Sequence, residues 1–159
     1  MEYETAAICL SGHTITPNLT NLEELPKFCI HCGEKVITAC PSCNAPIHGA
    51  EKVSAWVREG IFYSFPHYCY NCGKAYPWTA TAIKTAEELI DEEMQELTAE
   101  EKSKFKADLP CVISKTPKTN LAIKRISKFL KKVSPIAQET FKQIFYRFAT
   151  DVAKTALWA

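Results

Sequence analysis

The stretch "FCIHCGEKVITACPSCNAPIHG", residues 28–49, contains two Cys-x-x-Cys pairs that are separated by seven residues. Pairs of this kind serve as metal ligands, as redox groups or as disulfide partners. Further along the chain, "YCYNCG" supplies a third pair at Cys69 and Cys72. Toward the N-terminus, "CLSGH" places Cys9 four positions before His13, which makes a fourth pair of donors.

These four pairs match the donor requirement of zinc. Structural zinc takes four nitrogen or sulfur donors in a tetrahedron, so eight donors make two closed sites with none left over. The remaining cysteine, Cys111, has no partner nearby in the sequence. We therefore expect two zinc ions per chain, held by Cys9, His13, Cys29, Cys32, Cys40, Cys43, Cys69 and Cys72.

The residues around the pairs are typical of zinc knuckles. "FCIHCG" and "YCYNCG" place a glycine directly after the second cysteine, where it eases the turn that points backbone N–H groups at the sulfurs. Asn44 holds the same position in "CPSCN", and asparagine also tolerates the left-handed conformation. In "CLSGH", Gly12 stands where the second cysteine would be, and the next residue supplies a nitrogen donor.

The order of the knuckles predicts how they combine. The glycine-bearing knuckles at Cys29 and Cys69 each follow a knuckle of the other type, at Cys9 and Cys40. Two zinc ribbons in series are therefore expected. Two other arrangements use the same eight ligands. In a cross-braced arrangement the first pair joins the third and the second joins the fourth, and in a nested arrangement the two middle pairs share one ion.

Redox and catalytic chemistry fit the sequence less well. A thioredoxin-like pair sits at a helix start in a βαβ setting, which is missing around these cysteines. A catalytic zinc keeps one position for water, whereas both sites here can be closed by protein. The phosphate loop, H-E-x-x-H and G-x-S-x-G motifs are absent, so we expect no enzymatic activity. We interpret His31, His48 and His67 as exposed groups or neighbours of the ligands.

Length and charge set further bounds. A chain of 159 residues forms one ordinary domain or two small ones. Its net charge of +1 hides a strong pattern, with −2 over residues 1–78, −7 over residues 79–101 and +10 over residues 102–159. The sequence has no apolar run long enough for a transmembrane helix and no secretory signal at its start, so the expected location is the cytoplasm, where thiols stay reduced.

The pattern of apolar residues predicts an α+β fold in two domains. Residues 1–78 are expected to form the two small zinc ribbons, and residues 79–159 an all-α region of about four helices. "KVSAWVREGIFYSF" alternates apolar and other residues, which predicts a β-hairpin of residues 53–57 and 61–65 turning near Gly60. Eight of the seventeen aromatic residues fall within residues 56–78, and we favour their packing within the fold over a contact surface.

Capping residues predict where most of the helices begin. Residues 79–97 carry an apolar stripe opposite acidic residues, which predicts the first helix. Thr98 with Glu101 forms a capping box, so a second helix is expected to run from there to residue 109, before Pro110. Thr-Pro at residues 116–117 and Ser-Pro at residues 134–135 mark the third and fourth helices. We favour a last helix that completes a bundle over one that docks a partner or lies on a membrane.

The third helix carries a basic face. Its expected inward residues are Leu121, Ile123, Ile126, Phe129 and Leu130, and its basic residues are Lys124, Arg125, Lys128, Lys131 and Lys132. Such a face binds phosphates of nucleic acid or anionic lipid in some proteins. The interpretation we favour is a solvated face that offsets the acidic first helix, because most charge runs have that role.

"ICLSGHTIT", "KFCIHCGEKVITACPSCNAPIHG", "YCYNCGKAYPW" and the later "TPKTNLA" together resemble a bacterial zinc-ribbon family catalogued only as a domain of unknown function (family 2321). The resemblance spans nearly the full length. It implies zinc-ribbon knuckles, a helical tail, and metal ligands at the eight positions named above. It implies no activity. Our leading hypothesis is a non-enzymatic module with structural zinc that binds a protein partner, and the alternative is a nucleic-acid-binding protein that uses residues 124–132.

Overall fold

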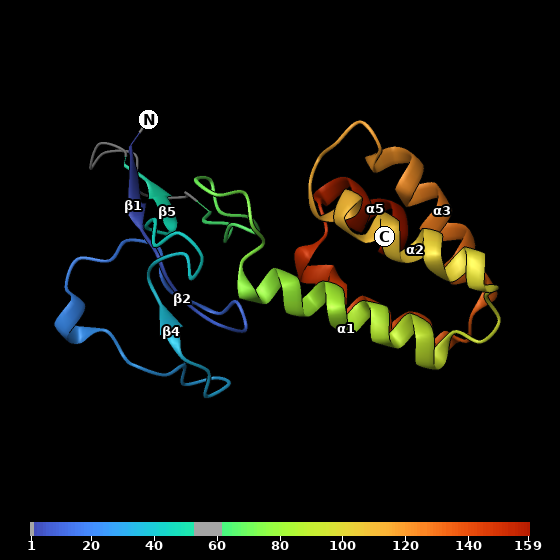
Figure 1. The fold of residues 1–159 in the computed structure, drawn as a ribbon, viewed down its shortest axis with the longest axis horizontal. Helices are drawn as coiled ribbons and strands as arrows, with labels where there is room; N and C mark the ends of the chain where they lie inside the picture. The colour runs from blue at the N-terminus through green and yellow to red at the C-terminus, as the bar shows by residue number, and fades with distance from the viewer. Residues whose placement is uncertain (1, 53–61) are drawn as a thin grey trace. The chain divides into compact units, whose positions relative to one another are not determined.

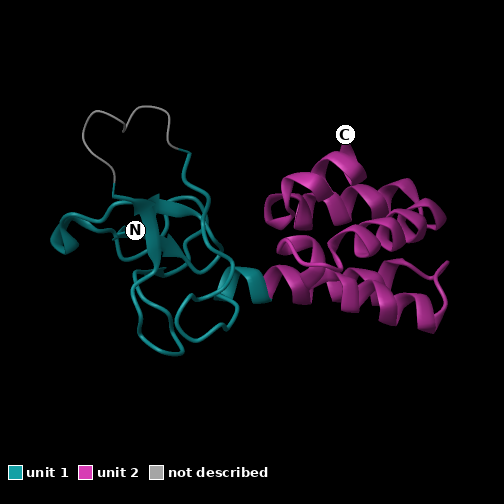
Figure 2. Ribbon diagram, turned by 90° about the horizontal axis from the view of Figure 1, so that it is seen from above, with its two compact units in different colours: residues 1–80 teal, residues 81–159 magenta. Residues whose placement is uncertain are grey.

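The computed structural model describes residues 2–52 and 62–159. The chain divides into two compact units, residues 1–80 and residues 81–159 (Figure 2), which we call the N-terminal unit and the helical unit. Helix α1 (Pro77–Glu93) begins in the first and continues into the second. In the part of the chain that the structure describes, no helix is both long and apolar enough to cross a membrane.

Two short antiparallel sheets form the N-terminal unit (Figure 1). In the first sheet, β1 (Tyr3–Thr5) pairs with β5 (His48–Glu51). In the second sheet, β2 (Ala7–Cys9) lies between β3 (Thr14–Thr16) and β4 (Val36–Ile37). Because β2 is the central strand, the turns at its C-terminal end and before β4 lie close together.

The apolar core of the N-terminal unit is small. Apart from ligand cysteines, the buried apolar residues between positions 2 and 80 that the structure describes are Ala6, Ala7, Ile8, Val36, Ile47, Tyr76 and Trp78. Only the last two are aromatic. Small domains with few large buried side chains are commonly stabilised by disulfides or metal ions.

The β-hairpin that the sequence predicts lies largely outside the described residues. Its first strand, residues 53–57, and the start of its second strand, residue 61, lie outside the described residues. Residues 62–65, the described part of the second strand, contain no strand.

The aromatic residues near the last knuckle divide between core and surface. Tyr76 and Trp78 are each 1% exposed, as the packing interpretation expects. Phe62 and Tyr70 are 97% and 56% exposed, so this interpretation is wrong for them. Trp56 lies outside the described residues. The two buried rings lie directly before and within the first turn of α1, whereas the two exposed rings lie in segments further from this helix.

The helical unit contains the remainder of α1 followed by four α-helices and one short 3-10 turn. In chain order these are α2 (Ala99–Ile113), α3 (Thr119–Lys132), α4 (Pro135–Phe145), η3 (Tyr146–Phe148) and α5 (Asp151–Trp158). Helix α3 packs against both α2 and α5 (Figure 1). Together with the small sheets of the N-terminal unit, these helices confirm the α+β class.

A group of phenylalanine rings forms the centre of this unit. The ring of Phe105 on α2 contacts Phe129 on α3 and Phe141 on α4, with centroids 5.6 and 5.2 Å away. Phe141 in turn stacks on Phe145 at 5.4 Å. Because these rings come from three helices, they fix the helices relative to one another.

Helix α1 differs from the expected span of residues 79–97 at both ends. It begins two residues earlier, at Pro77, because a proline suits the first turn, where its missing N–H has no helical partner. It ends at Glu93, where the amide of Gln95 donates to the carbonyl oxygens of Asp91 and Glu92, at 3.0 and 3.1 Å. These bonds satisfy carbonyls that the helix end leaves free.

Helix α2 begins where the sequence predicts, and both bonds of the capping box at Thr98 and Glu101 are present. Its expected end before Pro110 is wrong, because α2 continues to Ile113 with Pro110 inside it. Pro110 is exposed, whereas Val112 and Ile113 in the following turn are buried. Burial of these side chains therefore offsets the hydrogen bond that a proline within a helix removes.

Two further expectations on the helices are wrong. Leu121 is 51% exposed, and Thr119 and Ala122 are buried in its place, so the inward face of α3 is turned slightly from the predicted one. The last helix starts at Ser134-Pro135 as predicted but is interrupted after η3. The N–H of Thr150 donates to the carbonyl of Val112 at 2.8 Å, and its side chain caps α5.

The capping box yields a stability prediction. Thr98→Ala removes the hydroxyl that accepts the N–H of Glu101 at 3.1 Å, and we expect a loss of about 1 kcal/mol in the free energy of unfolding. Urea unfolding followed by circular dichroism at 222 nm measures it. Ser103→Ala, at an exposed position within the same helix, is the control and should leave stability unchanged or slightly higher. Equal stability of the two variants would contradict the capping role.

Candidate metal centres

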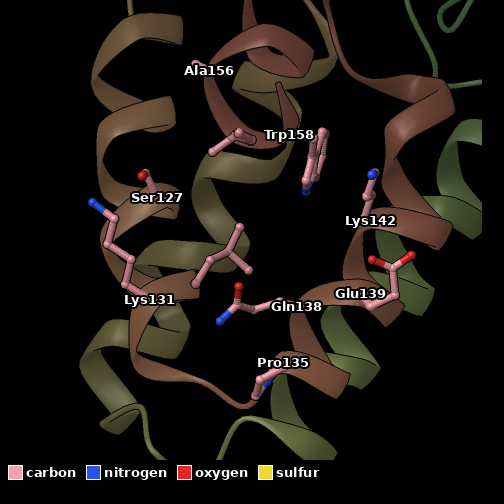
Figure 3. Close-up of a pocket in the computed structure, with 10 residues that line it drawn as sticks. Ser127, Lys131, Pro135, Gln138, Glu139, Lys142, Ala156 and Trp158 are labelled. Atoms are coloured by element: carbon pink, nitrogen blue, oxygen red, sulfur yellow. The ribbon is translucent and has the colours of Figure 1, made fainter.

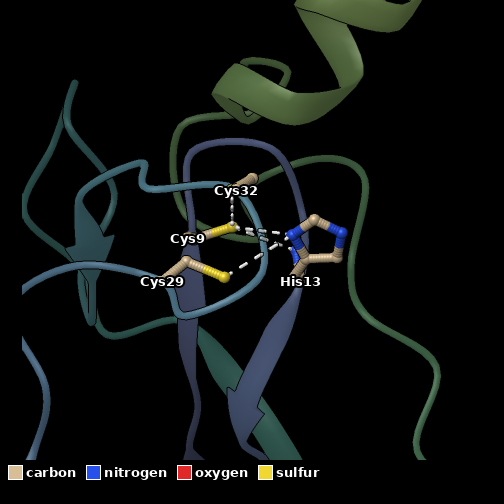
Figure 4. Close-up of side chains that lie close together, drawn as sticks. All are labelled: Cys9, His13, Cys29 and Cys32. Atoms are coloured by element: carbon tan, nitrogen blue, oxygen red, sulfur yellow. Dashed lines mark hydrogen bonds between the residues drawn. The ribbon is translucent and has the colours of Figure 1, made fainter.

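Two groups of four side chains in the N-terminal unit lie close enough together to hold a metal ion each. In each group, one donor atom from every residue lies within 4.8 Å of the other three. The first cluster consists of Cys9, His13, Cys29 and Cys32 (Figure 4), and the second cluster of Cys40, Cys43, Cys69 and Cys72. Each cluster joins two pairs that are consecutive along the chain, so the arrangement is serial.

Strand pairing assembles the first cluster. Cys9 is the last residue of β2 and His13 directly precedes β3, so the turn between these strands presents both side chains. Cys29 and Cys32 lie in the knuckle before β4, the other neighbour of β2. The carbonyl of Lys35, just before β4, accepts the N–H of Leu10 at 3.0 Å and holds the two turns together.

The distances between donor atoms match a tetrahedron around zinc. In the first cluster, Cys9 Sγ lies 3.4 Å from His13 Nδ1 and 3.6 Å from Cys32 Sγ (Figure 4). With Zn–S bonds of about 2.3 Å and a Zn–N bond of about 2.0 Å, tetrahedral edges measure about 3.8 Å between sulfurs and about 3.6 Å between sulfur and nitrogen. A disulfide would instead need sulfurs about 2.05 Å apart.

The second cluster has the same dimensions. Cys40 Sγ lies 3.8 Å from Cys72 Sγ, and Cys43 Sγ lies 3.6 Å from Cys69 Sγ. Its first knuckle follows β4 and its second precedes α1, so segments far apart in the sequence meet at this point. All four donors are thiols, whereas the first cluster has three thiols and one imidazole.

Three of the four knuckles share one backbone conformation. Gly33, Asn44 and Gly73, each four residues after the first cysteine of its knuckle, have positive φ angles of 76°, 62° and 74°. Their N–H groups donate to the carbonyl of that first cysteine at 2.8–2.9 Å. The Cys9 turn is one residue shorter, and Gly12 takes the positive φ there, at 88°. The sequence signal of glycine or asparagine therefore marks the residues whose φ is positive.

Each cluster contains at least one thiol whose pKa is lowered: Cys32 in the first, and Cys43 and Cys69 in the second. The backbone N–H of Glu34 lowers the pKa of Cys32 to about 6, and the backbone N–H of Cys72 lowers that of Cys69 to about 6. By contrast, burial raises the pKa of Cys9. Since the thiolate is the metal ligand, an acidic thiol in each cluster favours metal capture at neutral pH.

Sequence reasoning missed two residues beside the clusters, Tyr76 and Trp78 of "YPW". Tyr76 lies near the second cluster, where burial raises the pKa of its hydroxyl and the thiol of Cys69 raises it further. Trp78 lies against Gly12 of the first cluster, since a Cβ at Gly12 would come within 3.0 Å of the Trp78 Cβ. Their place directly after a knuckle was the available signal, but composition alone does not separate such rings from ordinary core.

The other cysteine and histidines that the sequence singles out lie outside both clusters. Cys111 is half-buried on α2. The ring of His31 lies 5.6 Å from that of His13, and His48 is stacked between two tyrosine rings at centroid distances of 4.3 and 3.8 Å. His67 meets a phenylalanine ring edge-on at 5.1 Å. These positions fit their interpretation as neighbours rather than ligands.

Comparison with known proteins identifies the family of this chain and gives no further relative. No curated protein and no solved structure matches it significantly. One family model, described as an uncharacterized protein conserved in bacteria (DUF2321), matches residues 2–157. Because this match covers almost the whole chain, together with all eight clustered side chains, the protein belongs to that bacterial family.

Proposed function

We propose that this protein is a non-enzymatic adaptor in which two structural zinc ions stabilise the N-terminal unit, and that this unit binds a protein partner through an exposed apolar surface. The observation that carries the proposal is a pair of complete four-donor clusters in a unit with a small apolar core. Four protein donors per ion leave no coordination position for a substrate, which favours a structural role. A reducing compartment such as the cytoplasm suits these thiols.

Zinc is the metal that we assign to both clusters. Thiolate-rich tetrahedral sites with one or no imidazole select zinc among abundant divalent ions. Metal analysis of the purified protein is expected to find two zinc ions per chain, with Cys111 as the one thiol that alkylates readily. An iron content with the absorption of an iron–sulfur centre, or fewer than one ion per chain, would contradict the assignment.

Several large apolar side chains near the first cluster face solvent. Ile30 within the second knuckle is 92% exposed, Leu22 on η1 (Leu22–Glu24) is 68% exposed, and Phe28 is 62% exposed. Two of these side chains, Leu22 and Phe28, line a groove of about 510 Å³, together with Glu23, Leu25, Pro26, Lys27, Lys35 and Val36. Apolar residues gathered in this way around a groove are characteristic of sites that bind another protein.

The adaptor function is tested by partner capture from the native host. The wild-type chain is expected to retain a protein in stoichiometric amount, and Leu22→Ser combined with Ile30→Ser is expected to lose it while keeping two zinc ions. Ile136→Ser is the matched control, because Ile136 is 80% exposed on α4 and far from the groove in sequence. Retention of the same protein by the double variant, or no stoichiometric protein with the wild type, contradicts the proposal.

A second candidate function, nucleic-acid binding, is favoured by the charges on α3. Two of its five basic residues pair with α2, Arg125 with Asp108 at 3.4 Å and Lys132 with Glu101 at 2.6 Å. From the sequence we expect this face to offset the acidic first helix, but the partners of Arg125 and Lys132 lie on α2. The other three, Lys124, Lys128 and Lys131, have no ion pair with any residue that the structure describes.

A pocket of about 500 Å³ lies beside this lysine face, between α3, α4 and α5 (Figure 3). Lys131 from α3 and Lys142 from α4 line it, together with the indole of Trp158 from α5. Lysines bind phosphates, and an accessible aromatic ring can stack on an unpaired base. These features support a single-stranded rather than a duplex ligand.

A salt series tests this candidate. Four phosphate contacts should weaken binding to a single-stranded RNA by roughly fiftyfold between 50 and 200 mM salt. Replacing Lys124, Lys128 and Lys131 with glutamine should abolish most of the binding. The control replaces Lys102, Lys104 and Lys106 on α2, which changes the net charge equally. Equal loss in both triple variants, or no binding at 50 mM salt, excludes the lysine face.

A further inference from the structure

The hydroxyl of Tyr76 is buried near the second cluster and has no well-formed hydrogen bond to any described residue. Tyr76 is 1% exposed, and its oxygen makes no hydrogen bond of good geometry with the described residues. Its backbone is held firmly, because its N–H donates to the carbonyl of His67 at 3.0 Å, two residues before Cys69. Burial raises the pKa of this hydroxyl most, and the neighbouring thiol of Cys69, followed by Cys40 and Cys43, raises that pKa further.

The partner of Tyr76 in the core reaches the first cluster. The ring of Trp78 stacks on that of Tyr76, with centroids 4.7 Å apart and planes at 19°. Its Nε1–H donates to the carbonyl of Pro66 at 2.8 Å, which fixes the orientation of the indole. Gly12, between the ligands Cys9 and His13, packs so closely that a Cβ would lie 3.0 and 3.2 Å from the Trp78 Cβ and Cγ.

We propose that Tyr76 and Trp78 are positioning residues shared by the two metal centres, and that an ion in one centre raises the affinity of the other. This inference rests on the zinc assignment made above. Tyr76 donates its hydroxyl hydrogen to the Cys69 thiolate of the metal-bound second cluster. Trp78 packs against both Tyr76 and the turn that carries Cys9 and His13, so the positions of the two are coupled.

The coupling follows from close packing between rigid groups. The stacked rings are fully buried, and the Gly12 turn has no space to move toward them. Binding an ion fixes the Cys9–His13 turn, which in turn fixes Trp78 and therefore Tyr76. The second cluster then has less freedom to lose when its own ion binds, and the same argument holds in reverse because coupling is reciprocal.

The Tyr76 contact is tested with the full-length protein and Tyr76→Phe, which removes one oxygen and keeps the ring. Chelator competition should show zinc binding at the second cluster weakened about 10- to 100-fold, with the first cluster changed much less. Co²⁺ absorption distinguishes the two clusters, since one has four thiolates and the other has three with one imidazole. Tyr70→Phe, an exposed position between Cys69 and Cys72, is the control. Equal zinc affinities of the second cluster in Tyr76→Phe and Tyr70→Phe would refute the proposed hydrogen bond from Tyr76 to Cys69.

The coupling is tested by disabling the first cluster. Cys32→Ser should lower the zinc affinity of the second cluster at least about fivefold although its four ligands are intact. In a Trp78→Leu background this additional loss should disappear. An unchanged second-cluster affinity in Cys32→Ser, or an equal loss with and without Trp78, overturns the inference. A wild-type chain that binds neither zinc nor Co²⁺ refutes the zinc assignment itself. Failure of the zinc assignment is therefore distinguishable from failure of the coupling between the clusters.

Discussion

Removal of zinc by a strong chelator is expected to unfold the N-terminal unit while the helical unit keeps its secondary structure. The reason is the difference between their cores. Among its described residues, the N-terminal unit buries two large aromatic side chains, whereas Phe105, Phe129, Phe141 and Phe145 all pack within the helical unit. Structural zinc contributes about 10–16 kcal/mol to the folding of small zinc-binding domains, more than a core of this size supplies.

Amide NMR spectra of the full chain measure this effect for each unit separately. Resonances of residues 2–52 and 62–80 should collapse to the narrow range of an unfolded chain, while those of residues 99–158 remain dispersed. Adding zinc back under reducing conditions should restore the spectrum. Cys111→Ser, which alters a cysteine outside both clusters, should behave like the wild type. A fully dispersed spectrum after thorough chelation would refute the structural role of the metal.

The second large effect is expected from Phe141→Ala in the helical unit. Phe141 is fully buried and contacts Phe105, Phe145 and Trp158, at centroid distances of 5.2, 5.4 and 5.9 Å. Its truncation removes contacts to α2, α4 and α5 at once and leaves a cavity. Substitutions of this kind cost about 3–5 kcal/mol in the free energy of unfolding.

Urea unfolding at 222 nm, with both clusters loaded with zinc, measures this loss. Ile136→Ala is the matched control, because it removes a large apolar side chain from the same helix at a position that is 80% exposed, and it should shift stability by less than about 0.5 kcal/mol. If Phe141→Ala does not fold, Phe141→Leu is expected to fold with a loss of about 1–2 kcal/mol. Equal stabilities of the Phe141 and Ile136 variants would show that the phenylalanine cluster is not the centre of this unit.

Local features of the fold were predictable because they depend on a few neighbouring residues. The positive φ angles at Gly33, Asn44 and Gly73 follow from residue types that tolerate this conformation after a Cys-x-x-Cys pair. The N-caps at Thr98 and Ser134 follow in the same way from side chains that accept a hydrogen bond three residues on.

Expectations that depended on burial were less reliable. Periodicity placed Leu121 inside, but Ala122 fits the close approach of α3 to its neighbours and Leu121 is exposed. Likewise, Pro110 is a local signal for a helix end, and burial of Val112 and Ile113 outweighs it. The sequence also contains Thr150, whose side chain caps α5. Its backbone N–H, however, donates to the carbonyl of Val112 on α2, which only the folded chain brings near.

By itself, the sequence determined the donors, since the residue types, their spacing and the turn residues after them specify four knuckles for any arrangement of the chain. Tertiary structure decided which knuckles form one cluster, because the donors that meet are 23 residues apart for Cys9 and Cys32 and 32 residues apart for Cys40 and Cys72. It likewise placed Tyr76 near the second cluster and Trp78 against Gly12. The physical reason is range: dihedral preferences and short hydrogen bonds act within about five residues, whereas bringing together distant segments requires the strand pairing and close packing of the whole unit.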